Sequence, residues 1–496
     1  MVPEITNAIK IFYQGFLNQI YSNILCIRNS IKNNLYLKIL LILTFSGLIL
    51  RLYHLDDVSI WLDEGLTLAY SSHSIYDIWV ISTTTSPNPP LFYWLEHFMF
   101  ILGHNEVILR LISVIIGTFT IPFFYYAGKQ FYNEDIGIIS AALLTFSSFH
   151  IFYSQEARAY VLLLFFLTIA FIWYLKALET NNLKIWLFFG VFSALAFWTH
   201  FFAIIPVGTL FLYAFIRCLI KSRYKISKIK PILLSGIFFL ILSSPLFLII
   251  LHAIKAKAGS IENWGIQGFN LNLVTFIDIL GPWRIQALLL GTFLIIGVIS
   301  LFSINREKFL FLVFLILVPL SVLYYISFRM TIVSRYAIFL VLFIILGISF
   351  FFYLFHSRVK KPLFPVIIII IIALICLPSL DAYYLLDSKN GEDWRGAAMN
   401  IRNMAGQGDS ILIVPGFYSV PFNYYYNNTS EKTYELTVKN QSELNTVLSA
   451  NKEKTVFLIV TNLDLFNSSS WLSMSWIKEH FTLKFKKDSI SIYSTR

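Results

Sequence analysis

Long apolar runs separated by short polar connections occupy residues 36–384. A helix of about 20 residues, rising about 1.5 Å per residue, crosses the roughly 30 Å hydrocarbon core of a bilayer. The run LFPVIIIIIIALICLPSL at 363–380 is the plainest case. The apolar runs predict about eleven transmembrane helices, near residues 36–55, 106–127, 135–153, 158–178, 185–201, 203–220, 231–252, 285–303, 309–327, 336–356 and 363–384.

Both ends of the chain have different patterns. Residues 5–31 carry an apolar side chain at every third or fourth position, which predicts an amphipathic helix on the cytoplasmic leaflet within a segment 1–35. Residues 388–496 have the composition of a water-exposed domain and predict a small α/β unit. Its expected helices are 393–405, 441–450 and 469–480, and its expected strands are 410–414, 455–460 and 481–494.

Within the membrane domain 36–387, the long connection 56–105 has an organised pattern of its own. Residues 64–80 and 89–102 have helical spacing, which predicts two helices lying along the membrane surface. Three prolines in TTTSPNPP, at 83–90, predict a turn between them, because proline disrupts a helix interior.

Composition and charge agree with a membrane protein. The chain is 57% hydrophobic and 13% charged, with a mean hydropathy of +0.71, which a water-soluble surface could not accommodate. The net charge of +11 does not indicate a nucleic-acid partner, because the basic residues gather in every second connection. These positions are Lys10, Arg28, Lys32, Lys129, Lys176, Lys184, 217–230, 305–308 and 357–361. The positive-inside rule therefore predicts a multi-pass plasma-membrane protein with a cytoplasmic N-terminus and an extracytoplasmic C-terminal domain.

Ionisable residues collect at the predicted outer ends of the spans. Asp63 and Glu64 stand together in SIWLDEGLTLAY; FHIFYSQEARAY carries Glu156 and Arg158. FWTHFFA carries His200, SFRMTIVSRYAIF carries Arg329 and Arg335, and the C-terminal domain begins with EDWRG at 392–396. Carboxylates and arginines around one cavity suit a reaction in which a hydroxyl loses its proton while a phosphate leaves.

Each of these residues also has a purely structural interpretation. Asp63 and Glu64 could stabilise a helix N-terminus, where acidic side chains are favoured. Glu156 and Arg158 could form an ion pair between two spans. Arg329 and Arg335 could anchor helix ends to lipid phosphates, and His200 could be a packed residue.

The motifs resemble a known family when taken together and in order. WLDEG, NPPLFYWL, RLISVIIGTFTIPFFYYAGKQFY, FHIFYSQEARAY, WTHFFA, SRY and DWRGAA are similar to motifs of the bacterial and archaeal branch of GT-C glycosyltransferases. That branch is similar to protein O-mannosyltransferases and aminoarabinose lipid A transferases. The resemblance implies a GT-C type membrane domain with the α/β domain outside.

The resemblance also implies roles for individual positions. Asp63 would be the catalytic base, with Glu64 orienting it or contacting the acceptor, and Glu156 would be a second catalytic acid position. The donor phosphate would be held by Arg158, Arg335, His200, Tyr153 and Gln155. We further expect the acceptor or sugar to contact Trp61, Asn88, Trp264, Trp283, Trp394 and Arg395. Asn88 stands where relatives often have histidine, so no charged group is expected there.

These observations predict an inverting transfer of one sugar from a polyprenyl phosphate to a hydroxyl on a glycan, lipid or protein, by a monomer. No cofactor is required; a divalent cation could help to hold the phosphate, but no ligand cluster calls for one. Three rivals remain at this stage. They are a polymerase or ligase using a diphosphate-linked glycan, a secondary transporter, whose charged residues would lie at mid-membrane, and a non-catalytic scaffold.

Overall fold

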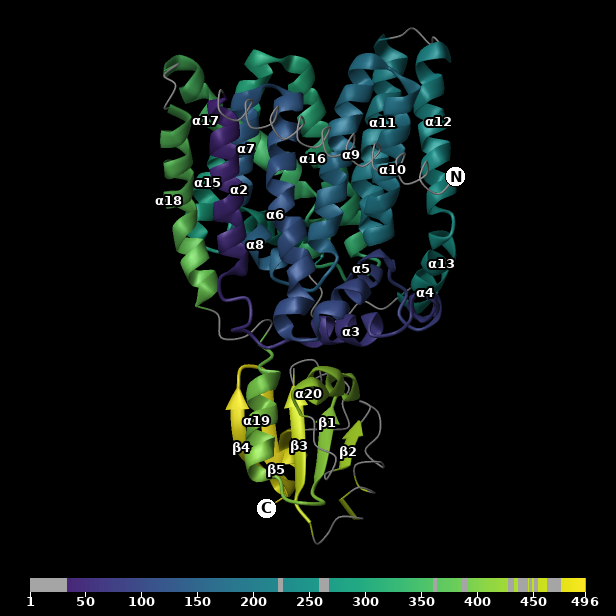
Figure 1. Cartoon of the computed structure of the whole chain (residues 1–496), viewed down its shortest axis with the longest axis vertical. Coiled ribbons are helices and arrows are strands. Elements are labelled where there is room, and N and C mark those ends of the chain that lie inside the picture. Colours follow the sequence, from purple (N-terminus) through teal and green to yellow (C-terminus); the bar gives the residue numbers. More distant parts are fainter. Residues whose placement is uncertain are drawn as a thin grey trace, which may run out of the picture.

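The computed structural model describes residues 34–221, 226–257, 267–359, 364–385, 391–426, 432–435, 445, 448–449, 454–461 and 474–495. A helical bundle forms one part of the molecule and a small α/β domain lies at one end of it (Figure 1). The predicted N-terminal helix, Trp264 and most of the predicted helix 441–450 lie outside the described residues.

Every predicted span is helical. Within the described ranges, eight helices are long and apolar enough to cross a membrane. They are α2 (Leu35–Leu52), α6 (Glu106–Phe131), α9 (Tyr160–Thr180), η2 with α11 (Phe201–Ala203 and Ile204–Lys221), α15 (Arg284–Ile304), α16 (Arg306–Ser327), α17 (Leu340–Val359) and α18 (Phe364–Tyr384). Two further spans are bent pairs, by 62° between α7 (Glu134–Thr145) and α8 (Ser148–Ser154), and by 67° between α12 (Ile226–Ser243) and α13 (Leu246–Lys257). The remaining segment is α10 (Leu183–Thr199), a shorter apolar helix packed against α9 and α12.

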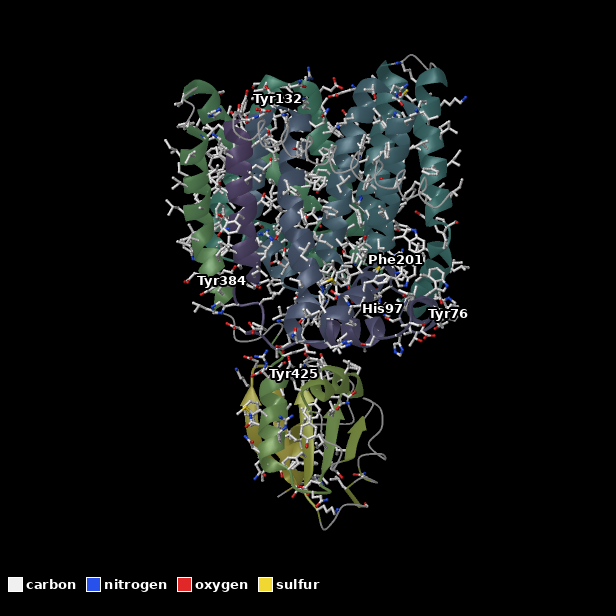
Figure 2. All side chains as sticks on the ribbon, in the orientation of Figure 1. Tyr76, His97, Tyr132, Phe201, Tyr384 and Tyr425 are labelled. Atoms are coloured by element: carbon white, nitrogen blue, oxygen red, sulfur yellow. The ribbon has the colours of Figure 1, made fainter. Side chains whose placement is uncertain are left out.

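The basic connections that the structure describes lie at the end of the bundle remote from the C-terminal domain. Lys308 Nζ bonds the carbonyl of Phe131, and Arg217 pairs with Glu307 at 2.9 Å. Figure 2 labels Tyr132 at this end and Tyr425, of the C-terminal domain, at the other. The spans therefore alternate in direction as the charge pattern predicted.

The connection 56–105 lies at the end nearest the C-terminal domain (Figure 1). It forms α3 (Leu62–Ser71), α4 (Ile75–Thr84), α5 (Leu91–Met99) and η1 (Phe100–Leu102). The prediction of a single helix at 64–80 is wrong. The first helix ends at Ser71, and Ser74 caps the start of a second helix by accepting a hydrogen bond from the Asp77 amide. The turn predicted at 83–90 lies between α4 and α5.

A further short helix, α14 (Gly268–Leu280), lies between the α12–α13 pair and α15. No helix was predicted there. It packs against α15, α16, α8 and the 3-10 turn η3 (Ser334–Ala337), so it lines the same end of the bundle as α3.

The C-terminal domain contains a five-stranded sheet in the order β2-β1-β3-β5-β4. The strands β1 (Ser410–Val414), β2 (Lys432–Glu435) and β3 (Val456–Thr461) are parallel, and β5 (Ile490–Ser494) is antiparallel to β3 and to β4 (Thr482–Lys487). The predicted strand 481–494 is thus a hairpin, with Asp488 at a φ of 52° in its turn. The helices in the described part of this domain are α19 (Trp394–Met404), α20 (Ser419–Tyr425) and α22 (Met474–His480), with η4 (Gly416–Tyr418) after β1.

Candidate active site

Asp63 lies in the first turn of α3, where the partial positive charge of a helix N-terminus favours a carboxylate. Its Oδ2 atom is 3.7 Å from Nε of Arg158 and 3.6 Å from Nη2 of Arg335. The three side chains are about one fifth exposed, at 22%, 17% and 22% respectively. The structure therefore brings together three residues that lie far apart in the sequence, at the edge of the bundle and still reachable from outside it.

The two arginines come from different breaks between helices. Arg158 lies in the turn between α8 and α9, and Arg335 lies in η3 before α17. Among the described residues, neither Nε atom has a hydrogen-bond acceptor although both are buried. Burial alone would lower the pKa of Arg158, but the nearby Asp63 carboxylate raises it above its ordinary value. Both guanidinium groups stay charged and retain donors for an anionic ligand.

Aromatic rings surround these charges. Arg335 lies over the rings of Trp61 and Tyr336, at 5.3 Å and 5.9 Å, and Arg158 lies 5.9 Å from the ring of Tyr160. Such contacts stabilise a cation in a partly desolvated place. The indole Nε1 of Trp61 is buried, and no acceptor for it occurs in the described part of the chain.

Two more of the predicted site residues join this aromatic wall. The His200 ring lies 5.8 Å from Tyr160 and 5.3 Å from Tyr336, and its Nδ1 accepts a hydrogen bond from the Phe202 amide. Tyr153 lies 5.4 Å from Tyr160. His200 and Tyr153 are thus neighbours of the arginine-bearing turns through Tyr160.

Glu64, adjacent to Asp63, has a different environment. It is fully buried and its two oxygens accept hydrogen bonds from Nε and Nη2 of Arg110, at 2.9 Å and 2.7 Å. Oε1 also accepts from the Ala157 amide at 3.1 Å. These contacts tie α3 to α6 and to the turn that carries Arg158, so they position the neighbouring Asp63.

Arg110 is the partner that sequence reasoning missed. Besides Glu64, it donates to the carbonyls of Leu55, Val58 and Ser59. The sequence did contain a signal for this partner. Arg110 lies near the start of the apolar run of α6, where an unpaired charge is costly.

The turn between α8 and α9 is held from several sides. The Nε2 of Gln155 donates to the carbonyls of Arg51 and Tyr53, at 3.0 Å and 2.7 Å, and its Oε1 accepts from Tyr383. Glu156 is buried, and its backbone carbonyl accepts a hydrogen bond from the Arg158 amide at 2.8 Å. Gln155 therefore anchors the turn, and Glu156 adds negative charge close to Arg335.

The residues expected to contact the acceptor are more scattered. Trp394 is completely buried in the core of the C-terminal domain, and Arg395 forms an ion pair with Glu106 at 2.5 Å. The Arg395–Glu106 pair joins the C-terminal domain to the bundle. Among the described residues, neither side chain contacts Asp63, Arg158 or Arg335, the three residues of the Asp63 cluster, and their contact with the acceptor stays a prediction. Trp283 precedes α15 and is 40% exposed, and the side-chain amide of Asn88 donates a hydrogen bond to Ser86. Contact of these two residues with the acceptor stays a prediction.

A further carboxyl group approaches the site from α14. Asp278 forms a hydrogen bond with Ser334, next to Arg335, and its charge acts on Tyr153. Burial raises the pKa of Asp278, and the bond from Ser334 opposes this. Because the helix α14 was not predicted, sequence reasoning had no means of placing this residue.

Comparisons with known proteins agree with this geometry. Residues 87–249 match the family model of dolichyl-phosphate-mannose-protein mannosyltransferase. The chain has the fold of the GT-C membrane glycosyltransferases, and the resemblance inferred from its motifs is confirmed at this level. No curated protein sequence is significantly similar to the chain.

Solved structures give the particular relatives. ArnT from Cupriavidus metallidurans in the apo state has a TM-score of 0.60 at 10% identity, over 92% of this chain and 97% of that one. ArnT bound to undecaprenyl phosphate has a TM-score of 0.57 at 11% identity, over 93% and 97%. The apo oligosaccharyltransferase of Archaeoglobus fulgidus has a TM-score of 0.57 at 12% identity, over 92% and 75%. These likenesses concern the fold.

Another structure of the Archaeoglobus fulgidus enzyme is a complex with zinc and sulfate. Within the described ranges, no group of three or more His, Cys, Asp or Glu side chains is placed to hold a metal ion. The described residues therefore do not form a site with three protein ligands of these types, and no step proposed below depends on a metal.

Proposed function

We propose that the protein transfers a single sugar from a polyprenyl phosphate to an acceptor hydroxyl, with Asp63 as the general base. The observation that supports this most directly is the placing of Oδ2 of Asp63 between the guanidinium groups of Arg158 and Arg335. A base beside two anion-binding forks is what such a transfer requires. The undecaprenyl phosphate bound by ArnT, which has the same fold, supports a donor of this class.

The reaction follows from this arrangement. The donor phosphate binds Arg158 and Arg335, which also stabilise the negative charge that grows on it as the bond to the sugar breaks. Asp63 then takes the proton of the acceptor hydroxyl, and the hydroxyl oxygen attacks the anomeric carbon opposite the departing phosphate. One bond forms as another breaks, so the configuration inverts.

The orientation belongs to the same proposal. The basic connections at the far end of the bundle would face the cytoplasm by the positive-inside rule. The Asp63 cluster and the C-terminal domain would then lie on the extracytoplasmic side of the plasma membrane. A donor attached to a membrane lipid supplies activated sugar there without a nucleotide. We expect a monomer to suffice, because the Asp63 cluster is formed within one chain.

The first test replaces Asp63 by asparagine and measures transfer from a polyprenyl-phosphate sugar by purified protein in lipid. We expect at least a hundredfold loss of kcat, the usual cost of removing a general base. Asp77→Asn is a matched control, because Asp77 is an exposed aspartate on the neighbouring helix α4. Retention of more than about a tenth of the activity by Asp63→Asn would contradict the assignment of the base.

A second measurement separates the proposal from its nearest rival. The same preparation is offered a monophosphate-linked sugar and a diphosphate-linked oligosaccharide on the same polyprenyl tail. Turnover of the monophosphate donor is expected. Turnover of the diphosphate donor alone would instead favour a polymerase or ligase, whose fold relative in Archaeoglobus fulgidus is an oligosaccharyltransferase.

A further inference from the structure

The helix that carries Asp63 lacks a cap of its own. The residue before α3 is Trp61, whose side chain makes no capping hydrogen bond. The first amides of a helix have no partner within the helix, so a buried helix N-terminus needs an external acceptor. For the Leu62 amide that acceptor is Oε2 of Glu392, at 2.9 Å, from the start of the C-terminal domain.

Glu392 is itself held in place. The same Oε2 atom accepts a hydrogen bond from Nε1 of Trp394 at 2.9 Å, and the backbone carbonyl of Glu392 accepts from Oγ of Ser59 at 2.8 Å. Only 4% of Glu392 is exposed. The carboxyl group therefore links Leu62 to the buried Trp394 at the boundary between the two parts of the molecule.

The C-terminal domain also contacts α3 beyond its first turn. Leu62 packs against the core formed by Trp394, Ile401 and Phe422. A Cβ atom added at Gly65 would lie 3.3 Å from the backbone nitrogen of Pro421, in α20, so the two backbones approach closely. Asp63 thus lies between two residues that are fixed by the C-terminal domain.

We propose that Glu392 is a positioning residue that holds α3, and through it Asp63, against Arg158 and Arg335. This inference rests on the proposed function, since it gives the C-terminal domain a part in the same reaction. Removing the carboxyl group would leave the Leu62 amide and the Trp394 indole without their acceptor. The first turn of α3 would then lose its register with the arginines. Donor binding would change little, because neither arginine contacts Glu392 in the interactions described here.

The test compares three variants in full-length protein, with kcat and the donor KM measured for each. Glu392→Ala removes the acceptor, and we expect kcat to fall at least tenfold while the donor KM stays within twofold. Glu392→Gln keeps one acceptor oxygen, which suffices because both hydrogen bonds end on the same atom, so we expect it to retain at least a third of kcat. Asp393→Ala is the matched control. It removes the N-cap of α19 and the ion pair with Lys487, so we expect a lower melting temperature and a kcat within twofold of the wild type.

Hydrogen exchange gives a second measurement that does not depend on activity. Peptides covering 60–66 are expected to exchange at least tenfold faster in Glu392→Ala than in the wild type, and at the wild-type rate in Asp393→Ala. If Glu392→Ala is not recovered folded, Glu392→Asp, one methylene shorter, is measured in the same way, with faster exchange at 60–66 again expected.

Several outcomes would overturn the inference. They are more than half of wild-type kcat in Glu392→Ala, an equal loss of kcat in Asp393→Ala, a loss in Glu392→Gln as large as in Glu392→Ala, or wild-type exchange at 60–66 in the variant measured. Asp63→Asn is assayed beside these variants. If it is active, the proposed function fails; if it is inactive while Glu392→Ala turns over normally, only the positioning role fails.

Discussion

The pairing of Glu64 with Arg110 leads to a quantitative expectation about stability. Both side chains are buried, at 0% and 1% exposure, and both oxygens of Glu64 accept from the guanidinium group. Removing one member of such a pair costs about 3–5 kcal/mol, because the other charge stays buried without compensation. We therefore expect Glu64→Gln to destabilise the folded protein by an amount in this range.

The corresponding change in melting temperature can be worked out from the chain length. An unfolding entropy of about 2.1 cal/mol/K per residue, over 496 residues, amounts to about 1 kcal/mol per degree for cooperative unfolding. The expected decrease is therefore about 3–5 °C, measured by thermal unfolding in detergent at one fixed scan rate. The double variant Glu64→Leu with Arg110→Met removes both charges and should be less destabilised than the sum of the single variants.

The same experiment decides between two roles for Glu64. If Glu64 acts by positioning Asp63, Glu64→Gln should lower the melting temperature, and the effects of the Glu64 and Arg110 substitutions on stability should not add. If Glu64→Gln melted within about 1 °C of the wild type while kcat fell by about a hundredfold or more, Glu64 would take part in the chemistry and the reasoning from burial would be refuted.

Three other expectations follow from the same contacts. Replacing Arg335 by lysine should raise the donor KM about tenfold or more, because an ammonium group cannot present two parallel donors to a phosphate; an unchanged KM in a donor titration would exclude Arg335 from the phosphate site. Burial raises the pKa of Glu392 to about 7, from an ordinary value of 4.5, so the folded chain binds this proton more tightly than the unfolded chain. The contribution of Glu392 to the free energy of unfolding should be complete below about pH 4.5 and decrease by about 3 kcal/mol as pH rises to 7. Glu392→Gln should therefore weaken the dependence of the melting temperature on pH, and an unchanged dependence would contradict the raised pKa of Glu392. Gly65→Val should weaken the docking of α20 on α3, because the valine side chain would meet the Pro421 backbone. The C-terminal domain of this variant should be cleaved by protease faster than in Gly208→Val, a control at an open position. Equal cleavage rates in the two variants would show that the contact is dispensable.

Much of the bundle could be predicted because a membrane span leaves a strong one-dimensional signal. Twenty consecutive apolar residues have few alternatives to a helix, as in α18, so position and direction follow from hydropathy and charge. The shorter elements depend on tertiary contacts. The 13 residues of α14 are too few to be stable in isolation, and the helix is held by packing against α15 and α16.

The candidate site divides in the same way. Asp63 could be singled out because two adjacent acids follow a span, and Arg158 and Arg335 because their motifs resemble those of a family. The partner of Glu64 could not, because Arg110 lies 46 residues further along and no local pattern joins them. Trp394 and Arg395 are predicted to contact the acceptor or sugar. The sequence could not show that α19, which carries both residues, lies at the domain junction, where Arg395 pairs with Glu106.

The contact between Glu392 and the Leu62 amide also concerns biosynthesis. Glu392 is translated 330 residues after Leu62, so the two can meet only after the membrane spans between them have been synthesised. If this contact sets the base in register, a nascent chain that does not yet include Glu392 turns over lipid-linked sugar at least tenfold more slowly than the folded protein. Full turnover would begin only when the C-terminal domain has folded against the bundle, which couples the onset of activity to the order of folding.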